Sequence, residues 1–517
     1  MARVAIDPIT RIEGHLRVDA VVEDGEVVEV RCGGTLFRGF EIILRGRDPR
    51  DAQQITQRVC GVCPMSHGVT ATLALDSAFG IADKVPRNGR LLRNIILGAN
   101  FIQSHILHFY HLAALDYVDI TAVADYDGTD IVLQTLRDFA QRGSLEPFVP
   151  RYEGDYRFDK ETNCALAAHY VEALRIRRIS HEMLAVIAGK MPHCAGIVPG
   201  GVAWRPTEDK IVAFLSYLNQ CREFIDNIYI PDVLVVAEAY PDYQLIGRGC
   251  GNYLAYGVFD LEDGVAKHEE RKRFLPGGST NRQLHYAVLD VGKITEEVAY
   301  SWFDGEVRHP SEGETNPNPD KEGAYSWLKA PRYNGKPHEV GPLARLMVAY
   351  AAEDTHVKPF LDGYLQRLGI TAADLPSVVG RHLARALETK LVADAMVDWL
   401  LQLEVGADGT IPVEVPQEGE GYGITEAPRG ALLHWHRIRN GKTDHYQLVV
   451  PTTWNACPAD SKGQPGPIEQ AILGTKIRDP ENPYEIVRIV RSFDPCLACA
   501  VHTLDLRGRT KAVARVC

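Results

Sequence analysis

Two Cys-x-x-Cys pairs stand near opposite ends of the chain, and a histidine follows each of them. Cys60 and Cys63 lie in RVCGVCPMSH, and Cys496 and Cys499 lie in DPCLACAVH. Paired thiolates bind soft metals such as zinc, nickel, Cu(I) and the iron of iron–sulfur clusters, so the two pairs together could form a four-thiolate metal site. A redox dithiol or half of a structural zinc site is the alternative for either pair taken alone.

The surroundings of the pairs weigh against these alternatives. A redox dithiol is expected at a helix N-terminus in a thioredoxin-like βαβ unit, which the hairpin-rich sequence near Cys60 does not predict. The two halves of a structural zinc site usually lie about 15 to 20 residues apart, whereas more than four hundred residues separate the pairs here. The spacing disfavours zinc without excluding it, and a four-thiolate site of some metal is the main interpretation.

The other cysteines are isolated from one another, and each is best interpreted as a small buried apolar side chain. They form no ferredoxin-type cluster motif. If the chain carries out redox chemistry, we therefore expect its electrons to leave through another subunit.

The bulk composition limits the possible partners. The chain has 517 residues, of which 45% are apolar and 24% charged, as in an ordinary soluble globular protein. A formal net charge of -12 without a Lys/Arg cluster argues against binding to nucleic acid. No run approaches the ~20 apolar residues of a membrane-spanning helix, and MARVAIDPITRIEGH lacks the apolar region of a signal peptide. We expect membrane contact only through partners.

The elements that must position the cysteines are both strands and helices. VVEDGEVVEV alternates apolar and polar residues around Asp24 and Gly25, which predicts an antiparallel hairpin within 1–32. From Pro86 the period is helical, and further long helices are expected at about 162–190, 207–229, 342–367 and 372–404. The predicted fold class is α+β and predominantly helical, with a central bundle of long helices and peripheral antiparallel β regions.

These elements divide the chain into segments. We expect an N-terminal β region with the first cysteine pair at 1–85, the first part of the helical bundle at 86–240 and a β and loop insertion at 241–341. The second part of the bundle is expected at 342–410, a C-terminal β and loop region with the second cysteine pair at 411–502, and an extension at 503–517.

The motifs resemble those of a known family. RVCGVCPMSH and DPCLACAVH resemble the two signature motifs of the large, catalytic subunit of nickel–iron hydrogenases. Further blocks look like family blocks in family order: DPITRIEGHLRV, TLFRGFE, HFYHLAALDYVD, GKMPHCAGIVPGG, YSWLKAPRY, EVGPLAR, EAPRG and VVPTTWN. The resemblance covers essentially the whole chain, and it implies the nickel–iron hydrogenase large-subunit fold.

The resemblance implies a Ni-Fe(CO)(CN)2 centre, in which four thiolates hold the nickel and the iron carries one carbon monoxide and two cyanides. By position, Cys60 and Cys496 would be terminal nickel ligands, whereas Cys63 and Cys499 would bridge nickel and iron. Thiolates suit a soft metal, and a terminal sulfur can also accept a proton. The implied reaction is the reversible heterolytic cleavage of H2 to protons and electrons, with the Cys496 thiolate as the base.

The resemblance also implies roles in proton transfer and electrostatics. Glu13 of RIEGH matches the family's proton-transfer glutamate, although an ion pair with Arg11 or another arginine is the alternative. Arg429 of EAPRG matches an arginine over the open coordination position. Asp116 and Asp494 match carboxylates that orient this arginine, although the aspartate before the proline could instead initiate a turn.

Four further matches would surround the iron ligands. Pro428, Pro451 and Thr452 would line the cyanide pocket, with the threonine hydroxyl as a donor where many relatives have serine. His67 matches a histidine behind a bridging thiolate.

A magnesium site and a gas channel are implied as well. Glu41, the backbone carbonyl of Leu448 and His502 match a Mg(2+) site behind the active centre. Val62 and Leu115 match residues at the narrow end of the gas channel, where their bulk would tune gas access.

The sequence after His502, TLDLRGRTKAVARVC, resembles a tail that a maturation protease removes in this family once nickel-insertion proteins have acted. We therefore expect the extension 503–517 to be cleaved on maturation. Hydrogen-sensing relatives commonly lack such a tail, so it favours an uptake hydrogenase over the alternative, a non-catalytic H2-sensing homologue.

Pro64 and Ser66, with the modest chain length, look most like the group 2 uptake branch of cyanobacteria and actinobacteria. The resemblance implies an Fe-S cluster-containing small subunit as the electron-accepting partner, and we expect a higher oligomer of heterodimers. The expected location is the cytoplasm or the membrane periphery through partners. Two weaker interpretations are the quinone-site subunit of respiratory complex I, which lacks the metal-binding thiols, and a structural zinc protein.

Overall fold

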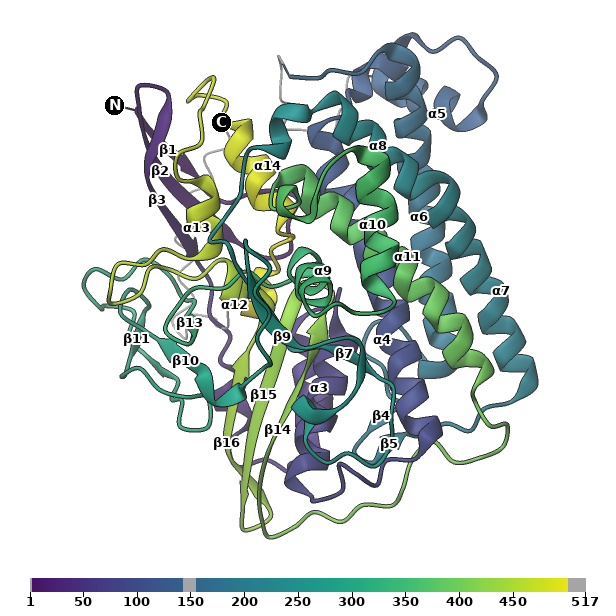
Figure 1. Ribbon diagram of the computed structural model, residues 1–517, viewed down its shortest axis with the longest axis vertical. Coiled ribbons are helices and arrows are strands. Elements are labelled where there is room, and N and C mark those ends of the chain that lie inside the picture. The colour runs from purple at the N-terminus through teal and green to yellow at the C-terminus, as the bar shows by residue number, and fades with distance from the viewer. Residues whose placement is uncertain (1, 143–154, 501–517) are drawn as a thin grey trace.

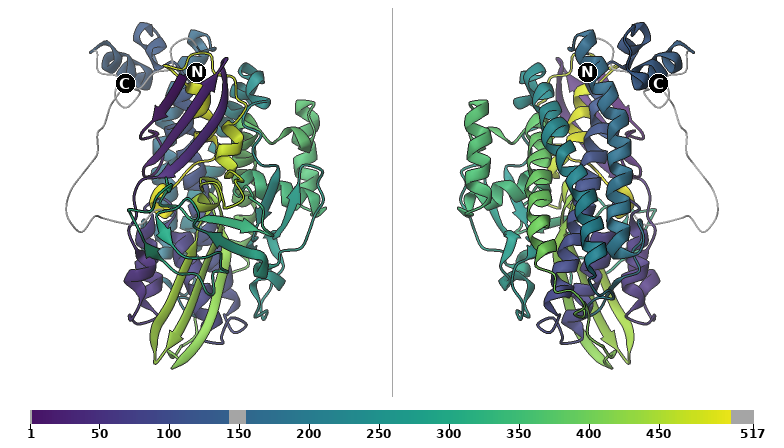
Figure 2. Two further views of the ribbon diagram at one scale, coloured as in Figure 1. Left: turned by 90° about the vertical axis from the view of Figure 1, so that its left-hand side faces the viewer. Right: turned by 90° about the vertical axis from the view of Figure 1, so that its right-hand side faces the viewer.

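The computed structural model describes residues 2–142 and 155–500 (Figure 1). Long helices gather on one side of the molecule, and antiparallel sheets lie on the other, as the two side views in Figure 2 show. The structure is mixed helix and sheet and is 45% helical. The predicted α+β class is therefore confirmed.

The helical side is built around the long helices α4 (Arg87–Leu107), α6 (Lys160–Ala188), α7 (Glu208–Phe224) and α11 (Val378–Leu401). Helix α6 packs between α4 and α7, and α11 contacts both of them. Nearly every residue of α4 is buried, so this helix lies inside the bundle rather than at its surface. The Asp159 side chain accepts the Thr162 N–H at 2.8 Å and thereby caps the start of α6.

The helix expected at 342–367 is interrupted. It forms α9 (Pro342–Ala351) and α10 (Val357–Leu368), with a turn between them at which Glu353 has a positive φ of 56°. The Asp354 carboxylate accepts the N–H groups of His356 and Val357 at 2.9 Å each, so it satisfies the first donors of a new helix. Apolar periodicity continues across the break, which is why the sequence pattern did not reveal it.

The N-terminal sheet has the order β1-β2-β3, with β1 (Ala2–Ile6), β2 (Leu16–Glu23) and β3 (Glu26–Gly34) antiparallel. Asp24 and Gly25 form the turn between β2 and β3, with φ angles of 48° and 78°. The predicted hairpin is therefore confirmed.

The C-terminal sheet consists of β14 (Glu418–Ala427), β15 (Gly430–Arg439) and β16 (Lys442–Val449). Helix α3 (Pro64–Ala78), which begins just after the first cysteine pair, packs on β14 and β15. The contact is close because β14 carries glycines that face the helix: a Cβ added at Gly423 would lie 2.3 Å from the Thr70 carbonyl oxygen. The paired residues Ala427 and Gly430 leave a two-residue turn between β14 and β15.

The remaining elements are short. Small two-stranded sheets pair β4 (Ile197–Val198) with β5 (Gly201–Val202), β6 (Asn252–Ala255) with β9 (Gly278–Asn281), β7 (Val258–Asp260) with β8 (Arg273–Leu275), β10 (Ile294–Glu297) with β13 (Ala330–Tyr333) and β11 (Phe303–Asp304) with β12 (Asn316–Pro317). The other α-helices are α1 (Phe40–Leu44), α2 (Asp51–Thr56), α5 (Ile131–Gln141), α8 (Ile230–Ala239), α12 (Pro451–Asn455), α13 (Pro467–Ile472), α14 (Tyr484–Ser492) and α15 (Leu497–Ala500).

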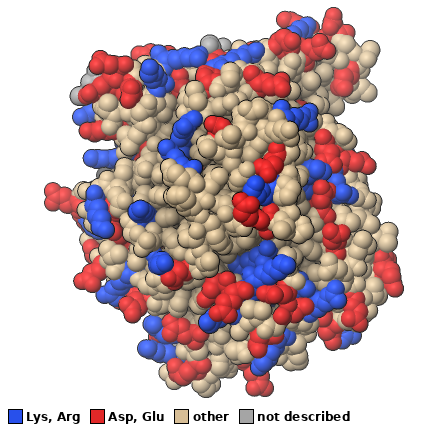
Figure 3. All heavy atoms as spheres, in the orientation of Figure 1, with Lys and Arg blue, Asp and Glu red and all other residues tan. Residues whose placement is uncertain are grey.

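The surface carries charges of both signs. On the face shown in Figure 3, Lys and Arg side chains are interspersed with Asp and Glu side chains. Within 2–142 and 155–500, no helix combines the length and the apolar character needed to cross a membrane.

Candidate metal centre

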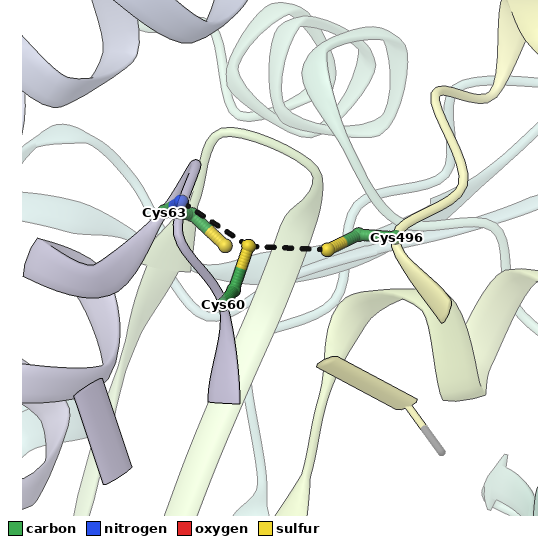
Figure 4. Close-up of side chains that lie close together, drawn as sticks. All are labelled: Cys60, Cys63 and Cys496. Atoms are coloured by element: carbon green, nitrogen blue, oxygen red, sulfur yellow. Dashed lines mark hydrogen bonds between the residues drawn. The ribbon is translucent and has the colours of Figure 1, made fainter. Parts of the chain in front are cut away.

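Three of the four motif cysteines meet in the interior, as Figure 4 shows. The Sγ atoms of Cys60, Cys63 and Cys496 lie within 4.8 Å of one another, and those of Cys60 and Cys496 are 3.4 Å apart. All three residues are buried, with exposed fractions of 1–2%. Cys499 lies in α15, one turn after Cys496, but its side chain is outside the described residues. The sequence expectation that the two distant motifs form one site is thus supported by three thiols.

The first motif is a tight loop in front of α3, with Cys63 as the residue that precedes the helix. The Cys60 Sγ atom accepts the N–H groups of Val62 at 3.2 Å and of Cys63 at 3.4 Å, which favours a thiolate there. The Val62 carbonyl in turn accepts the side-chain amides of Asn100 at 2.9 Å and Gln103 at 2.6 Å. Helix α4 therefore fixes the loop that presents the first two cysteines.

The second motif is held by segments from elsewhere in the chain. The Cys496 N–H donates to the Thr452 hydroxyl at 2.9 Å, which ties the cysteine to α12. The backbone around Glu13 pairs with the backbone around Cys496, and the Leu497 N–H donates to the Glu13 carbonyl at 2.6 Å. Segments around Glu13 and Thr452 thus hold the backbone of the second motif at Cys496 and Leu497.

Glu13 contacts this sulfur directly. The Cys496 thiol donates to Glu13 Oε2 at 3.1 Å, and the same oxygen accepts the Ala498 N–H at 3.0 Å. Burial and the nearby charge of Cys60 raise the pKa of Glu13 above its ordinary value, against opposing effects of Cys496 and Arg429. A carboxyl with a raised pKa beside a thiol can both accept and donate a proton.

Arg429 occupies the turn between β14 and β15 and is only 2% exposed. Its Nη2 atom lies 2.9 Å from Asp494 Oδ1, and its Nε–H donates to the Asp494 carbonyl at 3.0 Å. Burial lowers the pKa of Arg429, but Asp494 and the thiolates of Cys496, Cys63 and Cys60 outweigh it and raise this pKa. The guanidinium is therefore a fixed positive charge near the thiols.

Asp116 does not orient Arg429 as we expected. Its Oδ1 atom instead lies 2.5 Å from Arg11 Nη2 and also pairs with Arg491. The aspartate ends the helical segment that continues α4, and it there faces α14 and the N-terminal loop, both of which supply an arginine. Competition from these arginines could not be foreseen from the sequence. Of the two predicted carboxylates, Asp494 alone contacts Arg429.

The other predicted pocket residues are also buried. Pro428 lies in the β14–β15 turn, Pro451 begins α12, and Thr452 keeps its own O–H free to donate because its oxygen accepts from Cys496. His67 lies on α3, one turn after Cys63, and its Nδ1 atom is 3.2 Å from His434 Nε2. Burial lowers the pKa of His67 to about 4, so the imidazole is neutral.

Glu41 and Leu448, two of the expected magnesium ligands, are in contact through the Leu448 N–H rather than through its carbonyl. The Leu448 N–H donates to Glu41 Oε1 at 2.8 Å, and the Thr315 hydroxyl bonds to the other carboxylate oxygen. Sequence reasoning missed two neighbours, Glu296 and Lys329, whose side chains lie 3.9 Å apart. Burial raises the pKa of Glu296 to about 7, against the opposing charge of Lys329. The predicted third ligand, His502, and the extension 503–517 lie outside the described residues.

The two predicted gas-channel residues occupy different surroundings. Val62 is half-buried and packs against the main core. Leu115 is buried in a smaller apolar cluster with Ile120, Val123 and Leu133. The structure therefore places them in separate apolar clusters.

Comparison with known proteins gives matches along the whole chain. The profile of the nickel-dependent hydrogenase family matches residues 38–502, and a HoxL-like profile matches residues 3–32. The periplasmic [NiFeSe] hydrogenase large subunit of Desulfomicrobium baculatum is 44% identical over 99% of this chain and 97% of its own. The uptake hydrogenase large subunit of Rhizobium leguminosarum bv. viciae is 35% identical over 99% of this chain and 97% of its own.

Solved structures agree with these matches. A chain of the Ni-Fe-Se hydrogenase from D. vulgaris Hildenborough in the reduced state superposes with a TM-score of 0.87 at 43% identity, covering 97% of this chain and 100% of that chain. Two of the proteins named here carry selenium in their names, whereas this sequence has cysteine at all four motif positions.

Proposed function

Because the chain belongs to the large-subunit family of nickel-dependent hydrogenases, we propose that it is the H2-oxidising chain of an uptake hydrogenase. The observation that carries the proposal is the meeting of Cys60, Cys63 and Cys496 in one buried cluster, with Glu13 3.1 Å from the last sulfur. The chain is the large subunit of an enzyme whose activity is the oxidation of H2. The uptake direction is our inference.

The residues present fit a nickel–iron centre. Cys60, Cys63, Cys496 and Cys499 would hold it, and buried thiolates are the donors that soft metals prefer. Arg429 supports this assignment, because Asp494 holds its buried guanidinium as a fixed positive charge beside the thiols, where it would face an anionic ligand such as a cyanide. When bound, the centre would supply the polarisation that splits H2 heterolytically.

The chain's own residues would then handle the proton. The Cys496 sulfur accepts a proton, and Glu13 Oε2 receives it across 3.1 Å without an intervening water. Arg429, held by Asp494, keeps a positive charge beside the thiols throughout. The proton leaves by way of Glu13, whose side chain is half-buried.

We also propose that Glu41, the Leu448 carbonyl and His502 hold Mg(2+). The carboxylates of Glu41 and Glu296 are both buried, and the negative charge of Glu41 raises the pKa of Glu296. Lys329 is the cation that the described residues place against Glu296, at 3.9 Å. A divalent cation would offset the remaining negative charge, and oxygen donors suit magnesium.

The proposed partners follow from the family. An Fe–S small subunit would take the electrons, a protease and nickel-insertion proteins would mature the chain, and heterodimers would associate further. The proposed location is the cytoplasm or the membrane periphery through partners; a relative is called periplasmic, and another, from Wolinella succinogenes, is called quinone-reactive. The relatives named here are all hydrogenase chains, so the H2-sensing alternative gains no support.

The test is infrared spectroscopy of the purified heterodimer in the region of metal-bound carbon monoxide and cyanide, with nickel and iron analysis and dye-linked H2 oxidation. We expect the bands, both metals and turnover. Replacing Cys63 by Ser should abolish the bands, whereas Cys221→Ser, at an isolated buried cysteine of α7, should leave them unchanged. Stoichiometric zinc without nickel or bands would refute the proposal.

A further inference from the structure

A fully buried arginine lies behind the turn that carries Arg429. Arg345 of α9 is 0% exposed and forms a bidentate pair with Glu388 of α11, in which Nε donates to Oε1 and Nη2 donates to Oε2, both at 2.6 Å. Its Nη1 atom donates to Glu426 Oε2 at 2.8 Å. Two carboxylates from different elements thus hold one guanidinium in a fixed plane.

The remaining donors of Arg345 reach the backbone beside Arg429. Nη1 donates to the Ala427 carbonyl at 3.0 Å, and Nη2 donates to the Pro428 carbonyl at 2.9 Å. A guanidinium has five N–H donors, and each one here has an acceptor. The two carbonyls that immediately precede Arg429 are therefore fixed by one rigid group.

The start of helix α9 also lies close to the turn. Gly341, which precedes the helix, has a φ of 123°, and a Cβ added there would lie 3.1 Å from the Arg429 carbonyl oxygen. The backbone on both sides of the Arg429 side chain is thus in contact with the same end of α9.

The carboxylates that hold Arg345 are themselves anchored. Glu388 Oε2 lies 2.8 Å from His105 Nε2 of α4, the helix that also fixes the first cysteine loop through Asn100. Glu426 Oε1 accepts the Tyr256 N–H at 2.6 Å. The turn is therefore connected through Arg345 and Glu388 to the helical bundle as well as to the sheet.

We propose that Arg345 is a positioning residue, which holds the Ala427–Pro428 turn so that the Arg429 guanidinium lies against the thiolate cluster. The inference rests on the proposed function, because it concerns the placement of Arg429, the side chain that would face the iron ligands. It acts through Arg429 and does not contact the thiols itself. A lysine could replace the charge but not the five-donor plane.

The test compares Arg345→Lys with Arg332→Lys in the matured heterodimer. Arg332 is a matched control: it is 1% exposed, pairs with Asp460 at 2.7 Å and donates to the Gln464 carbonyl at 2.9 Å. Among the described residues, its hydrogen bonds go to Asp460, Pro331, Cys457 and Gln464 and not to the Arg429 turn. Nickel and iron content, the cyanide and carbon monoxide bands and H2 oxidation are measured for each variant.

We expect Arg345→Lys to shift at least one cyanide band and to lower turnover about tenfold or more at unchanged metal content per matured chain. Arg332→Lys should leave the band positions unchanged. The bands report only molecules that have matured, so a lower yield does not obscure their position. If no Arg345→Lys protein matures, Glu426→Gln takes its place, since it weakens one of the five contacts; a cyanide shift in that variant would support the inference.

Unchanged cyanide bands and turnover in the variant that matures would overturn the role of Arg345 while leaving the proposed function intact. An equal shift in Arg332→Lys would also overturn it, because any buried arginine would then have the same effect. Absence of carbon monoxide and cyanide bands from the unaltered enzyme would instead refute the proposed function, and the inference with it.

Discussion

Replacement of Glu13 by glutamine should separate proton transfer from assembly of the centre. Glutamine has the same length as glutamate, so its amide oxygen can still accept the Ala498 N–H and its position 3.1 Å from the Cys496 sulfur can be kept. It cannot carry a proton at neutral pH. The change therefore removes the chemistry of the side chain while it preserves the packing.

The expected loss follows from the direct contact. At 3.1 Å no water separates the thiol from the carboxyl, so Glu13 can take the proton from Cys496 directly. Removal of a positioned acid–base group costs about 10²- to 10⁴-fold in rate, which corresponds to about 3 to 5 kcal/mol of transition-state free energy. The turnover of Glu13→Asp should lie between that of the unaltered enzyme and that of Glu13→Gln, because a carboxylate about 1.5 Å further away needs a bridging water.

The assay is dye-linked H2 oxidation together with isotope exchange between H2 and deuterated water. Infrared bands and nickel content report whether the centre has assembled, and both should be unchanged in Glu13→Gln. Glu29→Gln on β3 is the matched control, because it makes the same chemical change at an exposed strand position. Full exchange and turnover in Glu13→Gln would remove Glu13 from the relay and refute the reasoning.

Three other predictions concern hydrogen bonds and ion pairs around the thiol cluster. Arg429→Lys should reduce turnover about 10²- to 10³-fold at unchanged nickel content, because a lysine cannot keep the two-point contact with Asp494; activity within a few-fold of the unaltered enzyme would contradict this. Thr452→Val should destabilise the chain by about 1–3 kcal/mol in chemical denaturation, since the buried Cys496 N–H loses its acceptor, whereas Thr452→Ser should not. Burial raises the pKa of Glu388, but Arg345 outweighs it and lowers this pKa from 4.5 to about 2. The Glu388–Arg345 pair therefore stabilises the fold above pH 4.5, and this contribution should be lost as the pH falls toward 2. Glu388→Gln should flatten that part of a plot of thermal stability against pH. An unchanged slope in this variant would argue against the prediction.

The cysteine cluster and the N-terminal hairpin could be predicted from residue type and spacing. Cys60, Cys63 and Cys496 meet as the pairing of two Cys-x-x-Cys motifs into one thiolate site predicted. The hairpin around Asp24 formed because a tight turn needs residues that tolerate positive φ. The break at Glu353 was missed because apolar periodicity does not report a capping side chain.

Pairings between distant charged groups could not be predicted in the same way. Asp116 was expected beside Arg429, but Arg11 and Arg491 arrive from other segments and pair with it. Arg345 stands in EVGPLAR, where an arginine in an apolar helix signals a buried charge, yet nothing in the sequence says which carboxylates it meets. Such partners are set by tertiary packing, which brings residues from all parts of the chain into contact.

The bridge between the backbone of Glu13 and that of Cys496 has a consequence for biosynthesis. The two residues are 483 positions apart, so a ribosome releases almost the whole chain before this contact can form. Until then the nascent polypeptide presents only the Cys60–Cys63 half of the cluster. The proposed four-thiolate site can therefore be completed only after translation, and a helper protein that acts during translation would have to keep the Cys60 and Cys63 thiols reduced until the second pair emerges.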